Sequence, residues 1–253
     1  LVEVCHNAIN LLNQQSSIYS TNPVINPEQS LLAGTLLESK KQGIVSYFNA
    51  IRIAAGLPTV EASADHFTVA QHMATLMSYR WNSLHLEITH SPSKPDGVSQ
   101  TFFDTAIGQG RGYAENISRS ANETSVYLMK KYVNMFLDDQ TETPMNFSHR
   151  SLLLTPKFSK IGYGISPNIG VIEINGAQST NVFLKAWPAN GITFMETLDN
   201  DKFYWTAQFL DNYTVDKSST EVKVTCLNTE ESWEFKTEQN NSSKRYEISS
   251  CNK

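Results

Sequence analysis

Two short stretches of the sequence combine residue types that can carry out chemistry. Glu115 lies among small and apolar residues in Tyr113–Ser118, and His149 lies in Ser148–Arg150. A charged group that is buried without a partner costs several kcal/mol, since even an uncharged polar group costs roughly 2–7 kcal/mol. We therefore expect Glu115 and His149, where they face inward, to face each other, a metal ion or a ligand.

The sequence contains no familiar hydrolase motif. It has no Gly-x-Ser-x-Gly, no His-Glu-x-x-His and no cysteine in a nucleophile context. His85, Glu87 and His90 stand close together, but their spacing would not put them on one helix face. Their segment also has the composition of a loop, so we interpret this cluster as incidental.

The other histidines and Arg150 have simpler interpretations. His72 falls on the apolar face of an expected helix and is interpreted as a core histidine, whereas His6 and His66 are expected to be exposed. Arg150 has two open interpretations, namely a clamp for an anionic ligand and an ion pair with an acidic residue at a helix end.

Apolar periodicity predicts that helices dominate the first half of the chain. We expect a short helix around the apolar residues Ala8–Leu12, and another that starts at Pro27 and ends before Gly56–Pro58. A third begins after Ser63 or Asp65, followed by a loop over 78–95, and a fourth covers about 121–138. Gly43 is a possible break, and Gly108, Gly110 and Gly112 are interpreted as a mobile connection into a turn that carries Glu115.

The second half of the chain has the composition of strands separated by Pro, Asn and Gly turns. The expected strands are 161–165, 171–174, 182–186, 203–210, 221–227, 232–236 and 245–249. Helices followed by strands favour an α+β fold, with a β-rich addition from about residue 190.

Length and charge narrow the class of protein. A chain of 253 residues fits one large domain or one ordinary domain with a small appendage. The formal charge of -5 and the scattered Lys and Arg argue against a dedicated nucleic-acid binder or an anionic-membrane binder. No apolar run approaches the roughly 20 residues that span a bilayer.

The first residue and the cysteines carry further expectations. The chain begins at Leu1, so we interpret it as a mature chain from which a signal peptide was removed. Cys226 and Cys251 either close a disulfide or, with Cys5, remain free thiols. Six Asn-x-Ser/Thr triplets are weak indicators of glycosylation, at Asn116, Asn122, Asn146, Asn212, Asn240 and Asn241.

Five sequence blocks, in order, resemble the CAP superfamily (cysteine-rich secretory proteins, antigen 5 and pathogenesis-related proteins), in its bacterial SCP-like extracellular branch. Together they cover about residues 45–187. The blocks are Phe48–Arg52 with Ala55–Leu57, Ala70–Ala74, Thr89–Ser91, Ala114–Ile117, and Ser148–Pro156 with Lys160–Gly164.

The resemblance implies an α-β-α sandwich with a central antiparallel sheet, in agreement with the order of helices and strands. On this basis we expect an N-terminal helical extension over 1–40, a CAP domain over 41–188 and a small β-rich domain over 189–253.

The resemblance also implies a cleft with two histidines and two acids. His90, Glu115 and His149 fall on three of these positions. The family places its second acid three residues after a Trp, and here Phe136 stands in the Trp place, which makes Asp139 the candidate. Ala114 replaces the usual Gly before Glu115.

The expected function is that of a secreted or cell-surface module that binds an extracellular protein, a glycan or a lipid. His90 and His149 with Glu115 would hold zinc or another divalent metal, or else the carboxylate would simply accept hydrogen bonds from both rings. The alternatives are a metal-dependent hydrolase of peptides or cell-wall material, with Glu115 and His149 as its catalytic residues, and a carrier of a sterol or other lipid. We expect no nucleic-acid partner and no transmembrane segment.

Overall fold

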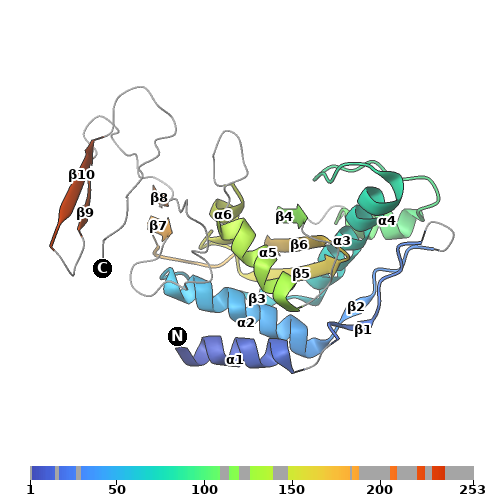
Figure 1. Ribbon diagram of the computed structural model, residues 1–253, viewed down its shortest axis with the longest axis horizontal. Coiled ribbons are helices and arrows are strands. Elements are labelled where there is room, and N and C mark those ends of the chain that lie inside the picture. Colours follow the sequence, from blue (N-terminus) through green and yellow to red (C-terminus); the bar gives the residue numbers. More distant parts are fainter. Residues whose placement is uncertain are drawn as a thin grey trace.

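A four-stranded sheet forms the middle of the molecule (Figure 1). The structure is a computed structural model that describes residues 2–14, 17–26, 30–108, 114–119, 126–138, 148–182, 184–187, 206–209, 221–225 and 230–236. The strand order is β3 (Glu61–Ala62), β5 (Lys160–Ser166), β6 (Ile169–Asn175) and β4 (Ala114–Arg119). β6 pairs antiparallel with β5 and β4, whereas the short β3 pairs parallel with β5.

Helices cover both faces of this sheet, which explains why β5 and β6 are buried along nearly their whole length. Side chains that alternate along the strands divide between two cores. Tyr163 and Ile172 pack with α2 (Glu38–Ala54) and α5 (Val126–Asp138). Ile169 and Val171 pack with α3 (Ala64–Leu84) and α4 (Gln100–Ala106). The predicted α-β-α sandwich is confirmed.

Two glycines of β5 allow α3 to lie directly on the sheet. A Cβ atom on Gly162 would lie 2.1 Å from the carbonyl carbon of His66, and one on Gly164 would lie 2.1 Å from the carbonyl oxygen of Ala70. Backbone atoms cannot give way as flexible side chains do, so any larger residue at these two positions would force the helix off the strand.

The N-terminal helix α1 (Val2–Asn13) packs along α2. Leu12 is fully buried in the same core as α2 and α5, and it lies so close to Gly43 that a Cβ atom there would be 2.8 Å from its Cγ. Gly43 therefore marks a close helix contact and not a helix break. The buried Lys40 donates to the Leu12 carbonyl near the end of α1.

Residues 30–37 are not helical, so the predicted start of the helix at Pro27 was wrong, although its later part is present as α2. β1 (Tyr19–Thr21) pairs with β2 (Thr35–Leu36), and α2 begins only at Glu38. Leu32 is 53% exposed while Leu36 is 3% exposed. These two residues are four apart and would share a helix face, so their different burial fits two short extended stretches.

α3 extends through Leu84, beyond the end that the sequence predicted, and the short α4 was not predicted. The last turns of α3 lack a clean apolar face because polar side chains are buried there. Ser78 donates to the carbonyl of Pro167 at 2.8 Å, and Arg80 donates to that of Ser93 at 3.2 Å.

The C-terminal part contains two strand pairs. β7 (Leu184–Trp187) pairs with β8 (Thr206–Phe209), and β9 (Glu221–Thr225) pairs with β10 (Ser232–Lys236), as the strand-like composition predicted. The strand predicted at 245–249 and the cysteines Cys226 and Cys251 lie outside the described residues.

Cys5, on the N-terminal helix α1, is a half-buried free thiol. The division at residues 40 and 188 stays a prediction, and no described helix could cross a membrane.

Candidate functional site

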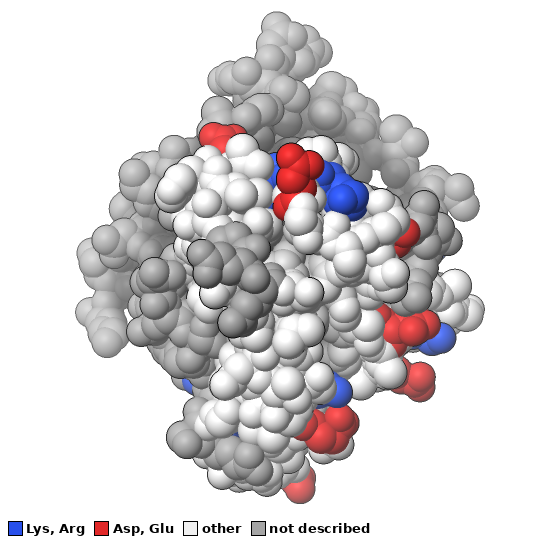
Figure 2. Space-filling model, turned by 90° about the vertical axis from the view of Figure 1, so that its right-hand side faces the viewer, with Lys and Arg blue, Asp and Glu red and all other residues white. Residues whose placement is uncertain are grey.

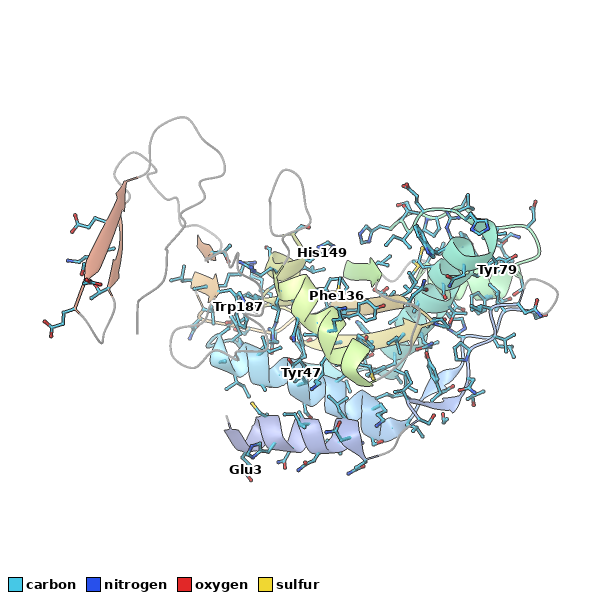
Figure 3. The ribbon with its side chains drawn as sticks, in the orientation of Figure 1. Glu3, Tyr47, Tyr79, Phe136, His149 and Trp187 are labelled. Atoms are coloured by element: carbon cyan, nitrogen blue, oxygen red, sulfur yellow. The ribbon has the colours of Figure 1, made fainter. Side chains whose placement is uncertain are left out.

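His149 lies on the short helix α6 (Ser148–Leu153), which follows α5 in the chain. Its half-buried ring packs on Phe136 of α5, with ring centroids 5.4 Å apart and ring planes inclined by 39° (Figure 3). Phe136 falls where the resemblance described above implies a Trp. An aromatic side chain there supports the imidazole and leaves part of it accessible to solvent.

Three buried cations hold α6 in place. Arg150 donates to the Leu137 carbonyl at the end of α5 and to Thr206 Oγ1 at 3.2 Å. Arg52 and Lys185 donate to carbonyls near the C-terminal end of α6, those of Leu153 at 2.7 Å and Ser151 at 2.8 Å. Cations at this end of a helix satisfy orphan carbonyls and interact favourably with the helix dipole. The backbone that carries His149 is thereby fixed.

Burial changes the ionisation of two of these cations. Burial lowers the pKa of Arg52 from its ordinary value to about 10. Burial, and repulsion by the Arg52 guanidinium, lower the pKa of Lys185 from 10.5 to about 8. Both side chains nevertheless donate hydrogen bonds to backbone carbonyls. Arg52 also donates to the carbonyl of Pro58 at 2.7 Å and to that of Thr155 at 3.1 Å.

Glu115 lies on β4, an edge strand of the sheet, and not in the turn that the sequence predicted. The register sets it opposite Glu173 of β6, which is 2% exposed. The side chain of Glu115 lies outside the described residues, and so does all of Asp139. The backbone thus places Glu115 on the last strand of the described sheet, whereas the role of Asp139 stays a prediction.

His90 is exposed and lies in the loop that follows α3. The helix ends at His85, whose φ of 53° is left-handed. The bonds of Leu86 N–H to the Arg80 carbonyl at 2.9 Å and of Arg80 to Ser93 at 3.2 Å tie the loop back to α3. His85 and Glu87 are likewise exposed, and the loop interpretation of this segment is confirmed.

The predicted metal site has the right kinds of ligand, because imidazole nitrogen and carboxylate oxygen are both zinc ligands. Among the side chains that the structure describes, no three from His, Cys, Asp and Glu are grouped so as to hold a metal ion. The carboxylate of Glu115 does not belong to the described set, so the combination of His90, Glu115 and His149 stays a prediction.

The other histidines divide between surface and interior. His6 is exposed, as expected. His72 packs its ring 4.8 Å from that of Phe102, and its Nδ1 donates to the Thr68 carbonyl at 2.7 Å. The expectation that His66 is exposed was wrong, because this residue is 3% exposed and hydrogen-bonds through both ring nitrogens.

The distribution of charge on the surface bears on the kind of partner that the protein could bind. The face in Figure 2 shows acidic and basic side chains in small separate groups, and most of the other described residues on it are uncharged.

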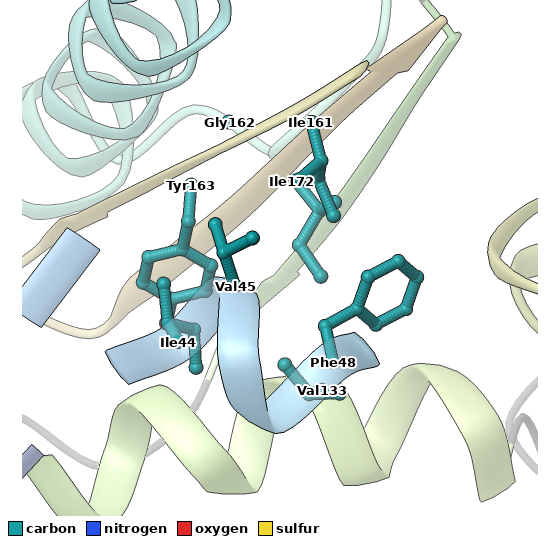
Figure 4. Close-up of a pocket in the computed structure, with 8 residues that line it drawn as sticks. All are labelled: Ile44, Val45, Phe48, Val133, Ile161, Gly162, Tyr163 and Ile172. Carbon is teal, nitrogen blue, oxygen red and sulfur yellow. The ribbon is translucent and has the colours of Figure 1, made fainter. Parts of the chain in front are cut away.

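A small apolar cavity lies between α2, α5 and the sheet (Figure 4), with a volume of about 10 Å³ that a water molecule could occupy. That is room for about one water molecule. The cavity is lined by Ile44, Val45, Phe48, Val133, Ile161, Gly162, Tyr163 and Ile172.

Several solved structures are similar to this chain. An extracellular protein containing a SCP domain from Bacillus anthracis is 16% identical, with 56% of this chain and 44% of that chain covered and a TM-score of 0.35. An outer surface protein from Borrelia burgdorferi is 15% identical, with 54% and 92% covered and a TM-score of 0.37. The CAP domain of Enterococcal PrgA is 16% identical, with 58% and 68% covered and a TM-score of 0.34.

These similarities are too weak to carry an argument about ligand or activity. The match spans less than half of the Bacillus anthracis chain, and no curated protein sequence matches.

The family comparison covers the sheet and the helices around it. Residues 45–171 match the family described as CAP: Cysteine-rich secretory protein family, which is half of the 253-residue chain. His90, Glu115 and His149 all lie within the matched range. With the α-β-α sandwich and the ordered sequence blocks, this match shows that the chain belongs to the CAP family.

Proposed function

We propose that this protein is a secreted or cell-surface CAP-domain module that binds its partner at a cleft formed by His90, Glu115 and His149. The observation that carries the proposal is the position of His149. Its backbone is clamped by buried cations, while its ring stays half-exposed against Phe136. A rigidly held polar side chain at a solvent boundary is typical of a binding site.

The other two residues of the proposed cleft, His90 and Glu115, lie on a loop and on an edge strand. His90 is exposed, and β4, which carries Glu115, is an edge strand among the strands that the structure describes. The secretory character of the family supports a location outside the cytoplasm. Fractionation of the source cells tests this part, and we expect the protein in the medium or at the cell surface. Recovery in the cytosol would contradict it.

The finer proposal concerns a divalent metal. His90, Glu115 and His149 would supply three protein ligands, and zinc bound by three protein ligands keeps a fourth position for water. Such a water is acidified toward neutrality, which is the chemistry the ion would supply when bound. The residues themselves would hold the ion and orient the ligand in the cleft.

Calorimetric titration with Zn²⁺ tests the metal proposal on the full chain. We expect one site, weakened at least about tenfold by His149→Ala or His90→Ala, since even loss of outer-shell partners costs 10–100-fold. His85→Ala is the matched control, because His85 is an exposed histidine of the same loop. Equal binding by all four proteins would overturn the metal proposal and leave the binding module standing.

The two alternative functions are a metal-dependent hydrolase and a carrier of a sterol or other lipid. A metal-dependent hydrolase would require Glu115 as its base, so unchanged hydrolysis of cell-wall peptides by Glu115→Gln would exclude it. Carriage of a sterol receives no support from the cavity between α2, α5 and the sheet, because that cavity has room for about one water molecule.

A further inference from the structure

A hydroxyl, an imidazole and an amide form a continuous hydrogen-bonded row at the start of α3. Ser63 Oγ lies 2.7 Å from His66 Nδ1, and His66 Nε2 lies 2.7 Å from Asn175 Oδ1. The three residues come from the residue before α3, its first turn and the end of β6. None of them belongs to the cleft of His90, Glu115 and His149.

The row fixes which ring nitrogen carries the proton. An amide oxygen only accepts, so His66 Nε2 must donate to Asn175 Oδ1. In the neutral imidazole the other nitrogen is then an acceptor, and Nδ1 faces the Ser63 hydroxyl. This is the order of nucleophile, base and orienting group found where serine is activated.

Helix capping alone does not account for the Ser63 hydroxyl. Ser63 is the N-cap of α3, but the capping bond from His66 N–H is 3.5 Å long. A bond of that length is weak, whereas 2.7 Å is a strong contact. The hydroxyl therefore interacts mainly with the imidazole.

The fold buries the base and leaves Ser63 partly exposed. His66 is 3% exposed, while Ser63 is half-exposed. The close approach that Gly162 permits brings the first turn of α3 onto the sheet, within reach of Asn175. The Asn175 carbonyl accepts from Ser159 N–H at 3.0 Å, which holds the orienting residue in place.

We propose that Ser63 is a nucleophile that transfers acyl groups from small uncharged esters to water. Ser63 Oγ attacks the ester carbonyl carbon while His66 Nδ1 takes the hydroxyl proton, and that proton then passes to the departing alcohol as the ester C–O bond breaks. Water, deprotonated by His66, next attacks the acyl carbon of the acyl-serine; the bond between that carbon and Ser63 Oγ breaks, the carboxylic acid leaves, and the proton on His66 returns to Ser63 Oγ. Exposed Glu61 and Asp65 flank Ser63 and disfavour anionic substrates.

This site is separate from the loop of His90. Ser63 precedes the 21-residue helix α3 and His90 follows it, and a helix of that length extends about 30 Å. Asn175 is a positioning residue in this proposal, since it acts only through the imidazole.

Labelling with a fluorophosphonate probe, located by mass spectrometry, tests the proposal on the full chain. We expect the label on Ser63, together with hydrolysis of p-nitrophenyl acetate. Loss of the base should lower both rates about 10²–10⁴-fold in His66→Gln, the usual contribution of general-base catalysis. Asn175→Ala should lower kcat with KM unchanged, and Asn175→Asp should restore it because a carboxylate accepts the same bond.

The controls separate catalysis from folding. Ser63→Gly should abolish the label at a cost of only a few tenths of a kcal/mol, because glycine is a tolerated N-cap. Ser99 caps α4 in the same way but has Phe102, not histidine, three residues later. Ser99→Gly should therefore label like the parent chain. An unlabelled Ser63 in the folded parent, or equal labelling of His66→Gln, would overturn the proposal.

Discussion

His149 owes its position to the residues around it. Phe136 supports its ring, and Arg150, the next residue, anchors α6 to the end of α5. Arg52 and Lys185 bind the other end of the helix. In the proposed cleft, a side chain held in this way would lose little entropy when a partner binds. The buried cations would then contribute to binding although none of them needs to touch the partner.

Lys185 gives a prediction in the alkaline range. Its pKa is about 8 in the folded chain and 10.5 ordinarily, so between these values the unfolded chain holds a proton that the folded chain has lost. The free energy of unfolding therefore rises with pH over that window. We expect urea denaturation to show the rise from pH 8 to 10, and Lys185→Met to reduce it; the buried Lys40, whose pKa burial also lowers, contributes in the same direction.

The predicted rise in stability ends near pH 10 because a buried tyrosine then acts in the opposite direction. Burial, with repulsion from Tyr132 and Tyr19, raises the pKa of Tyr163 well above 10. Above pH 10 tyrosine ionises in the unfolded chain while Tyr163 stays protonated in the fold, so its contribution lowers stability there. A parent chain that shows no rise below pH 10, or a rise of equal size in Lys185→Met, would contradict the assignment.

His72 gives a prediction in the acid range. Burial lowers its pKa below the ordinary 6.5, against the opposing effect of its bond to the Thr68 carbonyl. The unfolded chain then binds a proton first as pH falls below 6.5, so the free energy of unfolding decreases over that window, by about 1.4 kcal/mol for each unit of pKa difference at most.

Thermal unfolding between pH 7 and 5 measures this effect. We expect His72→Gln to flatten the pH dependence, because the amide keeps a donor but does not titrate. His6→Gln, at an exposed histidine of α1, serves as the control and should follow the parent chain. Parallel curves for all three proteins would exclude His72 as the source.

At the scale of elements, Arg52 joins α2 to the segment after α6. Its guanidinium donates to three carbonyls, at Pro58, Leu153 and Thr155. Arg52→Met keeps the length of the side chain but leaves these carbonyls without their donor, which costs about 1–3 kcal/mol for each acceptor that stays buried. Urea denaturation should show a loss of at least about 2 kcal/mol.

The surface pair of Lys41 and Glu38 provides the contrast. Its atoms are 3.5 Å apart and its side chains are 24% and 69% exposed, and such pairs contribute about 0–1 kcal/mol. Lys41→Met should therefore change stability little. Equal losses in the two variants would show that the Arg52 contacts do not hold the two segments together.

The contact between α3 and the sheet depends on Gly162. A methyl group there would meet the backbone of His66 at 2.1 Å, so Gly162→Ala should destabilise the chain by more than about 3 kcal/mol, at the upper end of overpacking effects. Gly97 has a φ of +79° but open space around it, and Gly97→Ala should cost only about 1–2 kcal/mol of backbone strain. A smaller loss for Gly162→Ala than for Gly97→Ala in urea denaturation would contradict the close packing.

At the scale of the whole molecule, the sequence predicted the sandwich because ordered motif blocks lie on its central elements. It did not predict the β1–β2 pair, since Leu32 and Leu36 fit helical spacing as well as strand pairing. It placed Glu115 in a turn because three nearby glycines outweighed the strand signal. The burial of His66 was not predicted, because its partner Asn175 is more than a hundred residues away, although Ser63 was one of two predicted caps of the helix that carries it.

The helix α1 lies before the range that matches the CAP family and packs against the core of the matched part. The matched family range begins at residue 45, within α2, yet α1 contributes the fully buried Ala8 and Leu12 to the core that includes α2, α5 and β5. The N-terminal helix therefore stabilises the face of the sandwich that carries α6. Its removal should lower stability and also loosen the support of His149.

The central claim is that His90, Glu115 and His149 share one cleft, and a high-resolution crystal structure grown with Zn²⁺ tests it most directly. We expect both imidazoles and the Glu115 carboxylate to face one site, with any bound zinc about 2.0–2.2 Å from their ligand atoms. Electron density that places the two rings on separate surfaces, with the carboxylate turned away from both, would contradict the claim.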